Sequence, residues 1–173
     1  TLNVIKYHCF HSDCNCYGVI KDDINKNNFQ AVSDTKLTLK EVSTEYWRTR
    51  EFPISVFDYL IKNNCIDAYH CGRVDIRYDF KQDRIVFCIA DKTNKIVDAA
   101  GRALNTNIVP KWYRYGSCRL PFVCGLNEHA VIVEDCASAT AISDYATGIA
   151  LLGTSLTNES FDIIKKYPIV TIA

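Results

Sequence analysis

Residues 129–173 alternate short apolar runs, rich in β-branched side chains, with segments of helical pattern, and this alternation constrains the fold more than any other feature of the chain. In order the segments read AVIVE, SATAISDYA, GIALLG, NESFDIIKKY and IVTIA, which predict strand, helix, strand, helix and strand. Strands that are apolar along their whole length are buried on both faces, and helices commonly connect parallel neighbours. The sequence therefore predicts an α/β domain with a parallel sheet and crossover helices.

An α+β subdomain is expected N-terminal to this sheet, over residues 51–128. Apolar residues recur at helical spacing at Ile54, Phe57, Leu60 and Ile61, and Pro53 suits a first turn, which predicts a helix over 54–63. Three strand-like runs follow, the second being RIVFCIA and the third KIVDAAGRAL. Because short polar turns separate them, they predict an antiparallel meander.

The N-terminal part is expected to form a separate small module. Residues 1–20 alternate apolar and polar side chains around a cysteine cluster and predict two short strands joined by a tight knuckle. Residues 21–50 are polar, without apolar periodicity, and predict a linker. The sequence contains no methionine, even at position 1, so we expect the chain to begin inside a longer gene product.

Composition excludes some classes of protein. Twenty basic side chains balance 20 acidic ones, so a surface for a polyanion has to be a local patch. No long apolar run and no signal peptide are present, which predicts a soluble cytoplasmic protein with no membrane partner. The nine cysteines are odd in number and mostly scattered, which favours buried thiols in a reducing compartment over a disulfide framework.

Charge follows the first of the buried parallel strands, at Glu134 and Asp135. Ligands of parallel α/β sheets bind at the carboxyl ends of the strands, so Glu134 is a candidate catalytic or metal-binding residue. The alternative for either residue is that its carboxylate caps the following helix. Small residues at the end of the next strand, Gly153, Thr154 and Ser155, would let the backbone approach a ligand.

This order of elements and side chains resembles the first part of a TOPRIM domain, the metal-binding catalytic fold of primases and of type I and II topoisomerases. The resemblance implies that Glu134 acts in catalysis and binds Mg²⁺ or Mn²⁺, together with an Asp-x-Asp pair on a later strand. The chain departs from the family pattern in two ways. In EDCAS, Asp135 and Ser138 stand where many members have glycine and aspartate, and IVTIA ends the chain without the Asp-x-Asp pair.

The cysteine cluster YHCFHSDCNCYG resembles the second half of the zinc-ribbon module that precedes the catalytic domain of phage-type primases. The resemblance implies that Cys9 and Cys14 are two Zn²⁺ ligands, with His11 and Cys16 as substitutes, and that the other two ligands lie upstream. The alternative is that these cysteines are reduced and bind no metal.

The middle region resembles the N-terminal subdomain of the same primases in the order of an Arg-hydrophobic-Phe strand, a Gly-Arg pair and a Lys-Trp-x-x-Tyr stretch. Cations and aromatic side chains are interleaved here, which suits phosphates and unpaired bases. The candidate residues for binding nucleic acid or nucleotide are Arg84, Arg102, Lys111, Trp112, Arg114 and Tyr115, with Arg119 and Tyr113 nearby. Arg102 is the first candidate for phosphate, because Gly101 leaves its backbone accessible. The alternative is an ordinary solvated strand with tyrosines packed on the core.

These resemblances imply a DNA primase of a phage-infected bacterial cell, with single-stranded DNA template and ribonucleoside triphosphates as partners and a fused or associated replicative helicase. A second hypothesis is a non-catalytic protein that binds single-stranded nucleic acid or assists replication on a degenerate primase scaffold. A topoisomerase-like or nuclease-like protein is a third, but no tyrosine stands at a recognisable nucleophile position.

Overall fold

The computed structural model divides the chain into two units, Thr1–Leu37 and Thr38–Ala173, and describes residues 4–8, 17–21, 42–118, 120–153 and 156–173. In the first unit, β1 (Val4–His8) pairs antiparallel with β2 (Tyr17–Lys21). The two strands predicted for residues 1–20 are therefore confirmed. The predicted zinc ligands Cys9 and Cys14, like His11 and Cys16, lie outside the described residues.

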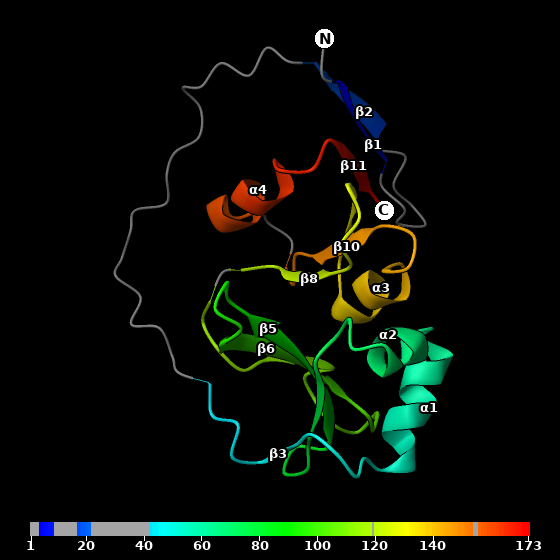
Figure 1. The fold of residues 1–173 in the computed structure, drawn as a ribbon, viewed down its shortest axis with the longest axis vertical. Helices are drawn as coiled ribbons and strands as arrows, with labels where there is room; N and C mark the ends of the chain where they lie inside the picture. The colour runs from blue at the N-terminus through cyan, green and yellow to red at the C-terminus, as the bar shows by residue number, and fades with distance from the viewer. Residues whose placement is uncertain (1–3, 9–16, 22–41, 119, 154–155) are drawn as a thin grey trace. The chain divides into compact units, whose positions relative to one another are not determined.

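The second unit begins with a five-stranded antiparallel sheet (Figure 1). Its strand order is β3-β4-β5-β6-β7, so each strand pairs with its neighbour in sequence. The strands are β3 (Trp47–Arg48), β4 (Ile76–Asp79), β5 (Arg84–Ala90), β6 (Ile96–Ala103) and β7 (Trp112–Arg114). The predicted meander is confirmed, and two strands that the sequence did not predict, β3 and β7, extend it at its edges.

The strand β3 corrects the C-terminal boundary of the linker predicted for residues 21–50. Trp47 is only 8% exposed, and its ring packs edge-on against Tyr115 with 4.8 Å between the ring centroids. A single buried aromatic residue in a polar segment produces no periodicity, so the sequence pattern did not predict this strand. Residues 42–50 of the predicted linker therefore belong to the second unit.

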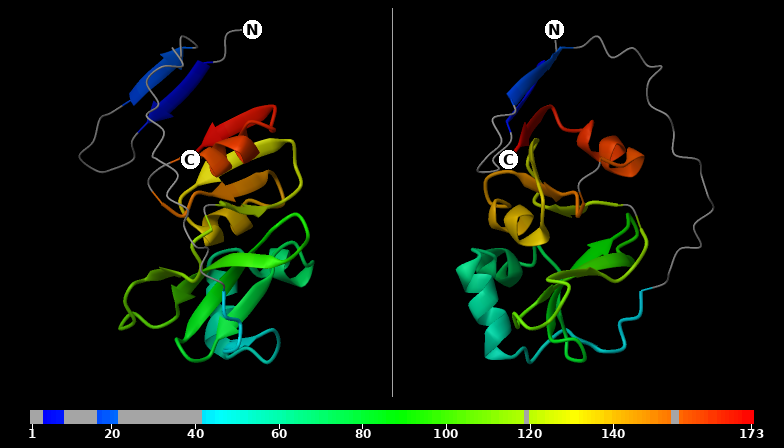
Figure 2. Two further views of the ribbon diagram at one scale, coloured as in Figure 1. Left: turned by 90° about the vertical axis from the view of Figure 1, so that its left-hand side faces the viewer. Right: turned by 180° about the vertical axis from the view of Figure 1, so that it is seen from behind.

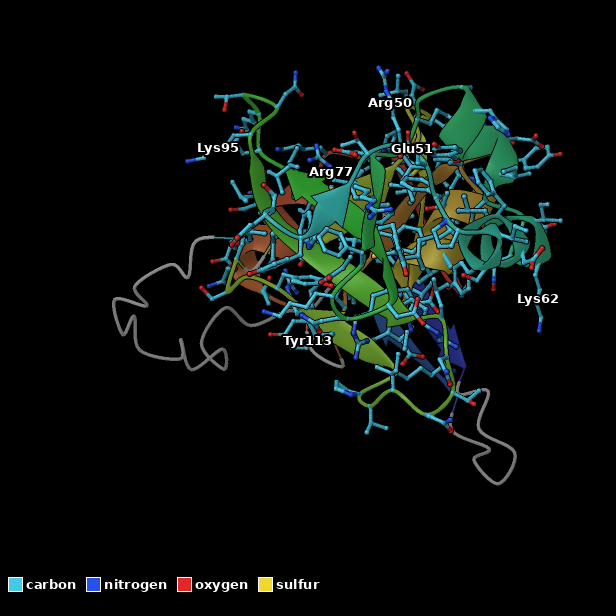
Figure 3. The ribbon with its side chains drawn as sticks, turned by 90° about the horizontal axis from the view of Figure 1, so that it is seen from below. Arg50, Glu51, Lys62, Arg77, Lys95 and Tyr113 are labelled. Carbon is cyan, nitrogen blue, oxygen red and sulfur yellow. The ribbon has the colours of Figure 1, made fainter. Side chains whose placement is uncertain are left out.

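Two helices pack against the antiparallel sheet, α1 (Ile54–Lys62) and α2 (Ile66–His70). The predicted helix over 54–63 is confirmed, but a different stripe of it is buried. Val56 and Leu60 enter the core beside β4 and β5, whereas Ile54 and Ile61 are 78% and 60% exposed. The side chain of Lys62 projects from the last turn of α1 into solvent (Figure 3).

The parallel sheet predicted for residues 129–173 is present, with strand order β11-β9-β10-β8. The strands β9 (His129–Val133), β10 (Thr147–Ala150) and β11 (Ile169–Ile172) are parallel, and β8 (Phe122–Cys124) adds an antiparallel edge. Two crossover helices, α3 (Cys136–Ala141) and α4 (Asn158–Ile164), lie on opposite faces of this sheet (Figures 1 and 2). The predicted α/β fold is therefore observed.

One continuous core joins the two sheets of the second unit. Phe87 of β5 packs edge-on against Phe122 of β8, and Leu60 of α1 shares a buried cluster with Cys136 and Ala137 of α3. This packing places the carboxyl ends of β9 and β10 beside β6 and β7. No helix in the described part of the chain is long and apolar enough to cross a membrane.

Candidate active site

The two acidic residues that follow β9, Glu134 and Asp135, have different roles. The Asp135 carboxylate accepts a hydrogen bond from the Ser138 backbone N–H at 3.0 Å and caps α3. The Glu134 side chain is exposed and makes no hydrogen bond or ion pair with the described residues. The helix-cap interpretation therefore holds for Asp135, and Glu134 keeps its carboxylate available for a ligand.

The turn after β10 lies against the same strand end. The backbone N–H of Leu152 donates to the carbonyl of Glu134 at 3.3 Å, and Leu152 has φ +57°. A non-glycine residue in the left-handed region costs about 1–2 kcal/mol, so the turn holds a locally strained backbone beside Glu134. A Cβ at Gly153 would meet open space. Thr154 and Ser155 lie outside the described residues.

A cavity of about 420 Å³ joins this strand end to the antiparallel sheet, and we call it the Glu134 cavity. The residues that line it come from β6 and β7 and from the ends of β9 and β10: Ala100, Lys111, Trp112, Tyr113, Arg114, Glu134, Asp135, Leu152 and Gly153. The structure thus brings Glu134 and Gly153 together with the predicted basic and aromatic stretch. No sequence pattern predicts this juxtaposition, because the two groups belong to different sheets.

Arg102 and Lys111 supply positive charge next to this cavity. Arg102 lies opposite Trp112 in the β6–β7 register, with its guanidinium carbon 5.5 Å from the centroid of the indole ring. The Nε atom of Arg102 is buried and has no hydrogen-bond partner among the described residues. Lys111 is exposed and also lines the Glu134 cavity. Lys111 is therefore available to an anionic ligand, and Arg102, which is partly exposed, makes no ion pair with the described residues.

Two of the predicted contact residues are structural in this fold. Arg84 is 2% exposed, and its Nη1 donates to the carbonyls of Gly101 at 3.4 Å and Lys111 at 3.5 Å. Tyr115 is also buried and donates its hydroxyl to Asp79. Because both side chains are buried and neither lines the Glu134 cavity, the structure corrects their prediction as ligand contacts. Both stabilise the sheet that presents Lys111.

Arg114 is held by hydrogen bonds within the fold and also lines the Glu134 cavity. Its Nε donates to the fully buried carboxylate of Asp98 at 2.7 Å, its Nη2 donates to the carbonyls of Cys118 and Leu120, and the residue lines the Glu134 cavity. Asp98 also accepts from the backbone N–H groups of Ala99 and Gly116. This network orients Arg114 and fixes β7 beside Glu134. Arg119 lies outside the described residues.

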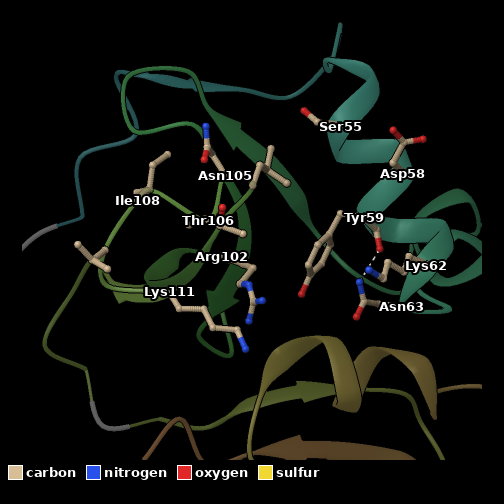
Figure 4. Close-up of a pocket in the computed structure, with 13 residues that line it drawn as sticks. Ser55, Asp58, Tyr59, Lys62, Asn63, Arg102, Asn105, Thr106, Ile108 and Lys111 are labelled. Atoms are coloured by element: carbon tan, nitrogen blue, oxygen red, sulfur yellow. Dashed lines mark hydrogen bonds between the residues drawn. The ribbon is translucent and has the colours of Figure 1, made fainter.

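A larger cavity of about 710 Å³, which we call the α1 cavity, lies between α1 and the β6–β7 connection (Figure 4). Arg102 and Lys111 line it together with Tyr59, whose hydroxyl pKa is raised by burial. Sequence reasoning missed its other polar residues, Ser55, Asp58, Lys62, Asn63, Asn105 and Thr106. A signal was present, because Ser55, Asp58 and Lys62 form a polar stripe at helical spacing.

The described residues contain no group of three histidine, cysteine or acidic side chains that could hold a metal ion. Glu134 nevertheless supplies a hard oxygen donor at an open cavity. Mg²⁺ commonly takes one or two protein carboxylates and fills its remaining positions with water and substrate phosphates. Glu134 therefore fits a Mg²⁺ or Mn²⁺ ion shared with a phosphate ligand, but the described residues do not form an all-protein metal cage.

No protein-family model and no curated protein matches the sequence. Among solved structures, the chain is similar to a DnaG primase catalytic domain bound to single-stranded DNA, with a TM-score of 0.52 and 17% identity over 72% of this chain. It is also similar to the E. coli primase catalytic core, with a TM-score of 0.54 and 17% identity over 69% of this chain. It spans 57% and 54% of those two chains. This likeness shows that the fold is that of a primase catalytic core.

Proposed function

We propose that this chain belongs to a DNA primase that synthesises RNA primers on a single-stranded DNA template. The observation that carries the proposal is the Glu134 cavity, in which a carboxylate at the end of a parallel strand faces a lysine and a tryptophan from a second sheet. Support comes from the primase-core fold and from the similar solved structure that contains single-stranded DNA.

Each part of the site has a role in this proposal. Arg102 and Lys111 neutralise phosphates, and Trp112 stacks against an unpaired base. Gly153 lets the backbone approach a phosphate, since a side chain there would occupy the open space that it faces. Glu134 acts as a general base or as a metal ligand. A bound Mg²⁺ would supply positive charge for phosphoryl transfer.

The finer parts of the proposal concern the complete gene product. We expect a phage-encoded primase with a zinc-binding module that includes Cys9 and Cys14 and with a fused or associated replicative helicase. The antiparallel β1–β2 pair is compatible with one half of such a module. Zinc content of the complete protein, before and after replacement of Cys9 and Cys14 by serine, tests this part.

The main experiment compares Glu134→Gln with Glu128→Gln in the complete gene product. Both glutamates are exposed, but Glu128 precedes β9 and Glu134 follows it, so they lie at opposite ends of one strand. Ribonucleotide incorporation is measured on a single-stranded DNA template with Mg²⁺, together with DNA binding by fluorescence anisotropy. We expect Glu134→Gln to lose activity by about 10²–10⁴-fold and Glu128→Gln to match the wild type.

A non-catalytic binding protein is the second candidate, and one observation favours it. Ser138 stands where the TOPRIM pattern has an acidic residue, and its backbone N–H is used to cap α3. If the wild-type protein and both variants bind single-stranded DNA but form no primer, this candidate replaces the primase. Full activity of Glu134→Gln would remove Glu134 from the chemistry.

A further inference from the structure

A group of two cations and two aromatic rings lies at β3, an edge strand of the antiparallel sheet. Trp47 of this strand is buried, so its neighbour Arg48 points to the opposite, solvent-facing side. Tyr46 directly precedes β3, and Phe80 and Lys81 belong to the turn between β4 and β5. We call Tyr46, Arg48, Phe80 and Lys81 the β3 cluster.

The four side chains of the β3 cluster contact one another in series. The guanidinium carbon of Arg48 lies 5.1 Å from the centroid of the Phe80 ring. The Phe80 and Tyr46 rings pack edge to face, with 5.8 Å between their centroids. The Nζ atom of Lys81 lies 4.3 Å from the centroid of the Tyr46 ring. Each cation is therefore held over a ring, within the usual distance of about 6 Å for a cation–π contact.

Hydrogen bonds fix the backbone that carries the β3 cluster. The Phe80 N–H donates to the carbonyl of Tyr46 at 3.1 Å, which ties the β4–β5 turn to the start of β3. The N–H groups of Lys81 and Gln82 donate to the buried carboxylate of Asp79 at 2.9 Å and 3.0 Å. The side chains are therefore positioned before a ligand arrives, which lowers the entropy lost on binding.

The β3 cluster presents both charge and apolar surface to solvent. Phe80 is 46% exposed, which is unusual for a phenylalanine. Arg48 and Lys81 are exposed, and neither side chain makes an ion pair or hydrogen bond with the described residues. An arginine that packs its planar face on a ring keeps its edge N–H groups free for a carboxylate. Carboxylates with an apolar side chain between them match this surface.

We propose that the β3 cluster is a docking site for a short acidic peptide segment of another protein. Two carboxylates of the segment bind Arg48 and Lys81, and an apolar side chain between them packs on Phe80. Charge complementarity is the basis for this choice of partner. The strands β3 and β7 are the two edges of the sheet, about 19 Å apart at the usual strand spacing, so a docked segment leaves the Glu134 cavity free.

A nucleic-acid strand fits the β3 cluster less well than a peptide. Both rings already contact a cation and each other, so little ring surface remains for a base to stack on. Exposed carboxylates flank β3 in sequence at Glu45 and at Glu51, which projects beside Arg50 (Figure 3). They would repel a backbone that carries a phosphate at every nucleotide. A peptide can place its few carboxylates only where the cations are.

The test measures peptide binding to the complete gene product by fluorescence anisotropy. The probe is a labelled peptide Glu-Asp-Phe-Asp-Glu. It is compared with the amide form Gln-Asn-Phe-Asn-Gln, with Glu-Asp-Ser-Asp-Glu and with a single-stranded DNA oligonucleotide. We expect the acidic peptide to bind at least about tenfold more tightly than its amide form at low salt, and this advantage to shrink as salt rises. Replacing its phenylalanine by serine should weaken binding several-fold.

Variants of the protein locate the binding surface. Arg48→Gln and Lys81→Gln should each weaken binding of the acidic peptide about tenfold, because a hydrogen bond between charged groups is lost. Phe80→Ser should remove the preference for the phenylalanine-containing peptide. Lys92→Gln is the matched control, since it removes one exposed cation from the turn at the other end of β5 and should leave peptide binding within about twofold of wild type. Circular dichroism verifies that each variant is folded.

Three outcomes would overturn this assignment: equal binding of the acidic and amide peptides to the wild-type protein, equal effects of Lys81→Gln and Lys92→Gln on peptide binding, or a larger effect of Arg48→Gln on DNA than on peptide. The last would assign the β3 cluster to nucleic acid. Peptide binding here does not involve Glu134, so its result is independent of whether the protein synthesises primers.

Discussion

Tyr115 donates its hydroxyl to the Oδ2 atom of Asp79 at 2.7 Å, and both side chains are buried. The other oxygen of Asp79 accepts from the backbone N–H groups of Lys81 and Gln82. Burial, with the neighbouring Asp79 carboxylate, raises the pKa of the Tyr115 hydroxyl, so that it remains a donor. This bond connects the end of β7 to β4, on the sheet that presents Lys111 and Trp112.

Removing this hydroxyl should destabilise the fold. Tyr115→Phe leaves one oxygen of a buried carboxylate without its partner, and we expect a loss of about 1–3 kcal/mol in the free energy of unfolding. Urea denaturation followed by circular dichroism measures the loss. Tyr113→Phe is the matched control, since the Tyr113 ring is partly exposed and should lose less than about 0.5 kcal/mol. Equal stability of Tyr115→Phe and wild type would show that the bond contributes nothing net.

Two glycines in the parallel-sheet region should differ in how strongly replacement by alanine affects stability. A Cβ on Gly148 of β10 would lie 2.1 Å from the carbonyl oxygen of Ala139, so α3 has to move away from the sheet. We expect Gly148→Ala to cost at least about 1–3 kcal/mol of stability. Gly153→Ala meets open space and should change stability by less than about 0.5 kcal/mol. Thermal unfolding of both variants measures the difference. Similar melting temperatures would contradict the close packing of α3 against Gly148.

The described cysteines should differ sharply in reactivity. Burial raises the pKa of Cys65 to about 12 and also raises the pKa values of Cys88 and Cys136. These thiols stay protonated near neutral pH, whereas the thiolate is the reactive form. We expect iodoacetamide to modify exposed Cys71 first and buried Cys65, Cys88 and Cys136 last, as peptide mass spectrometry can show. Early modification of Cys136 in native protein would contradict the buried core around α3.

The raised pKa of the Cys65 thiol should make stability depend on pH in the alkaline range. The pKa of Cys65 is about 12 when folded and close to 9.0 when unfolded, so above 9.0 the unfolded chain binds fewer protons than the folded one. Stability from this group is complete below pH 9.0 and is lost as pH rises toward 12. A Cys65→Ala variant should therefore show a weaker decline of stability over this range.

Much of the fold is predictable from local patterns. The helix α1, the meander β4-β5-β6 and the alternating strands and helices after residue 129 follow from apolar periodicity and from turn residues. The short elements β3, β7, β8 and α2 were not predicted. They contain two to five residues each, too few for a period to show.

In the candidate site, too, some features follow from local sequence patterns and others depend on the tertiary structure. Sequence alone predicted that Glu134 and Gly153 follow successive parallel strands, whose carboxyl ends share one edge of a sheet. The structure shows that these strands, β9 and β10, are neighbours. Only the tertiary structure decided that Arg84 and Tyr115 are buried, since periodicity does not show which sheet face another layer covers.

The tertiary structure also decided that Lys111 and Trp112 lie beside Glu134 and that Asp58 lines a cavity with Asn105. These neighbours are far apart in sequence. They meet because the buried side chains of both sheets, Phe87 against Phe122 and Leu60 beside Cys136, pack into one core. Burial of apolar surface is non-directional, so this docking depends on the shapes of whole faces and leaves no local signal in the sequence.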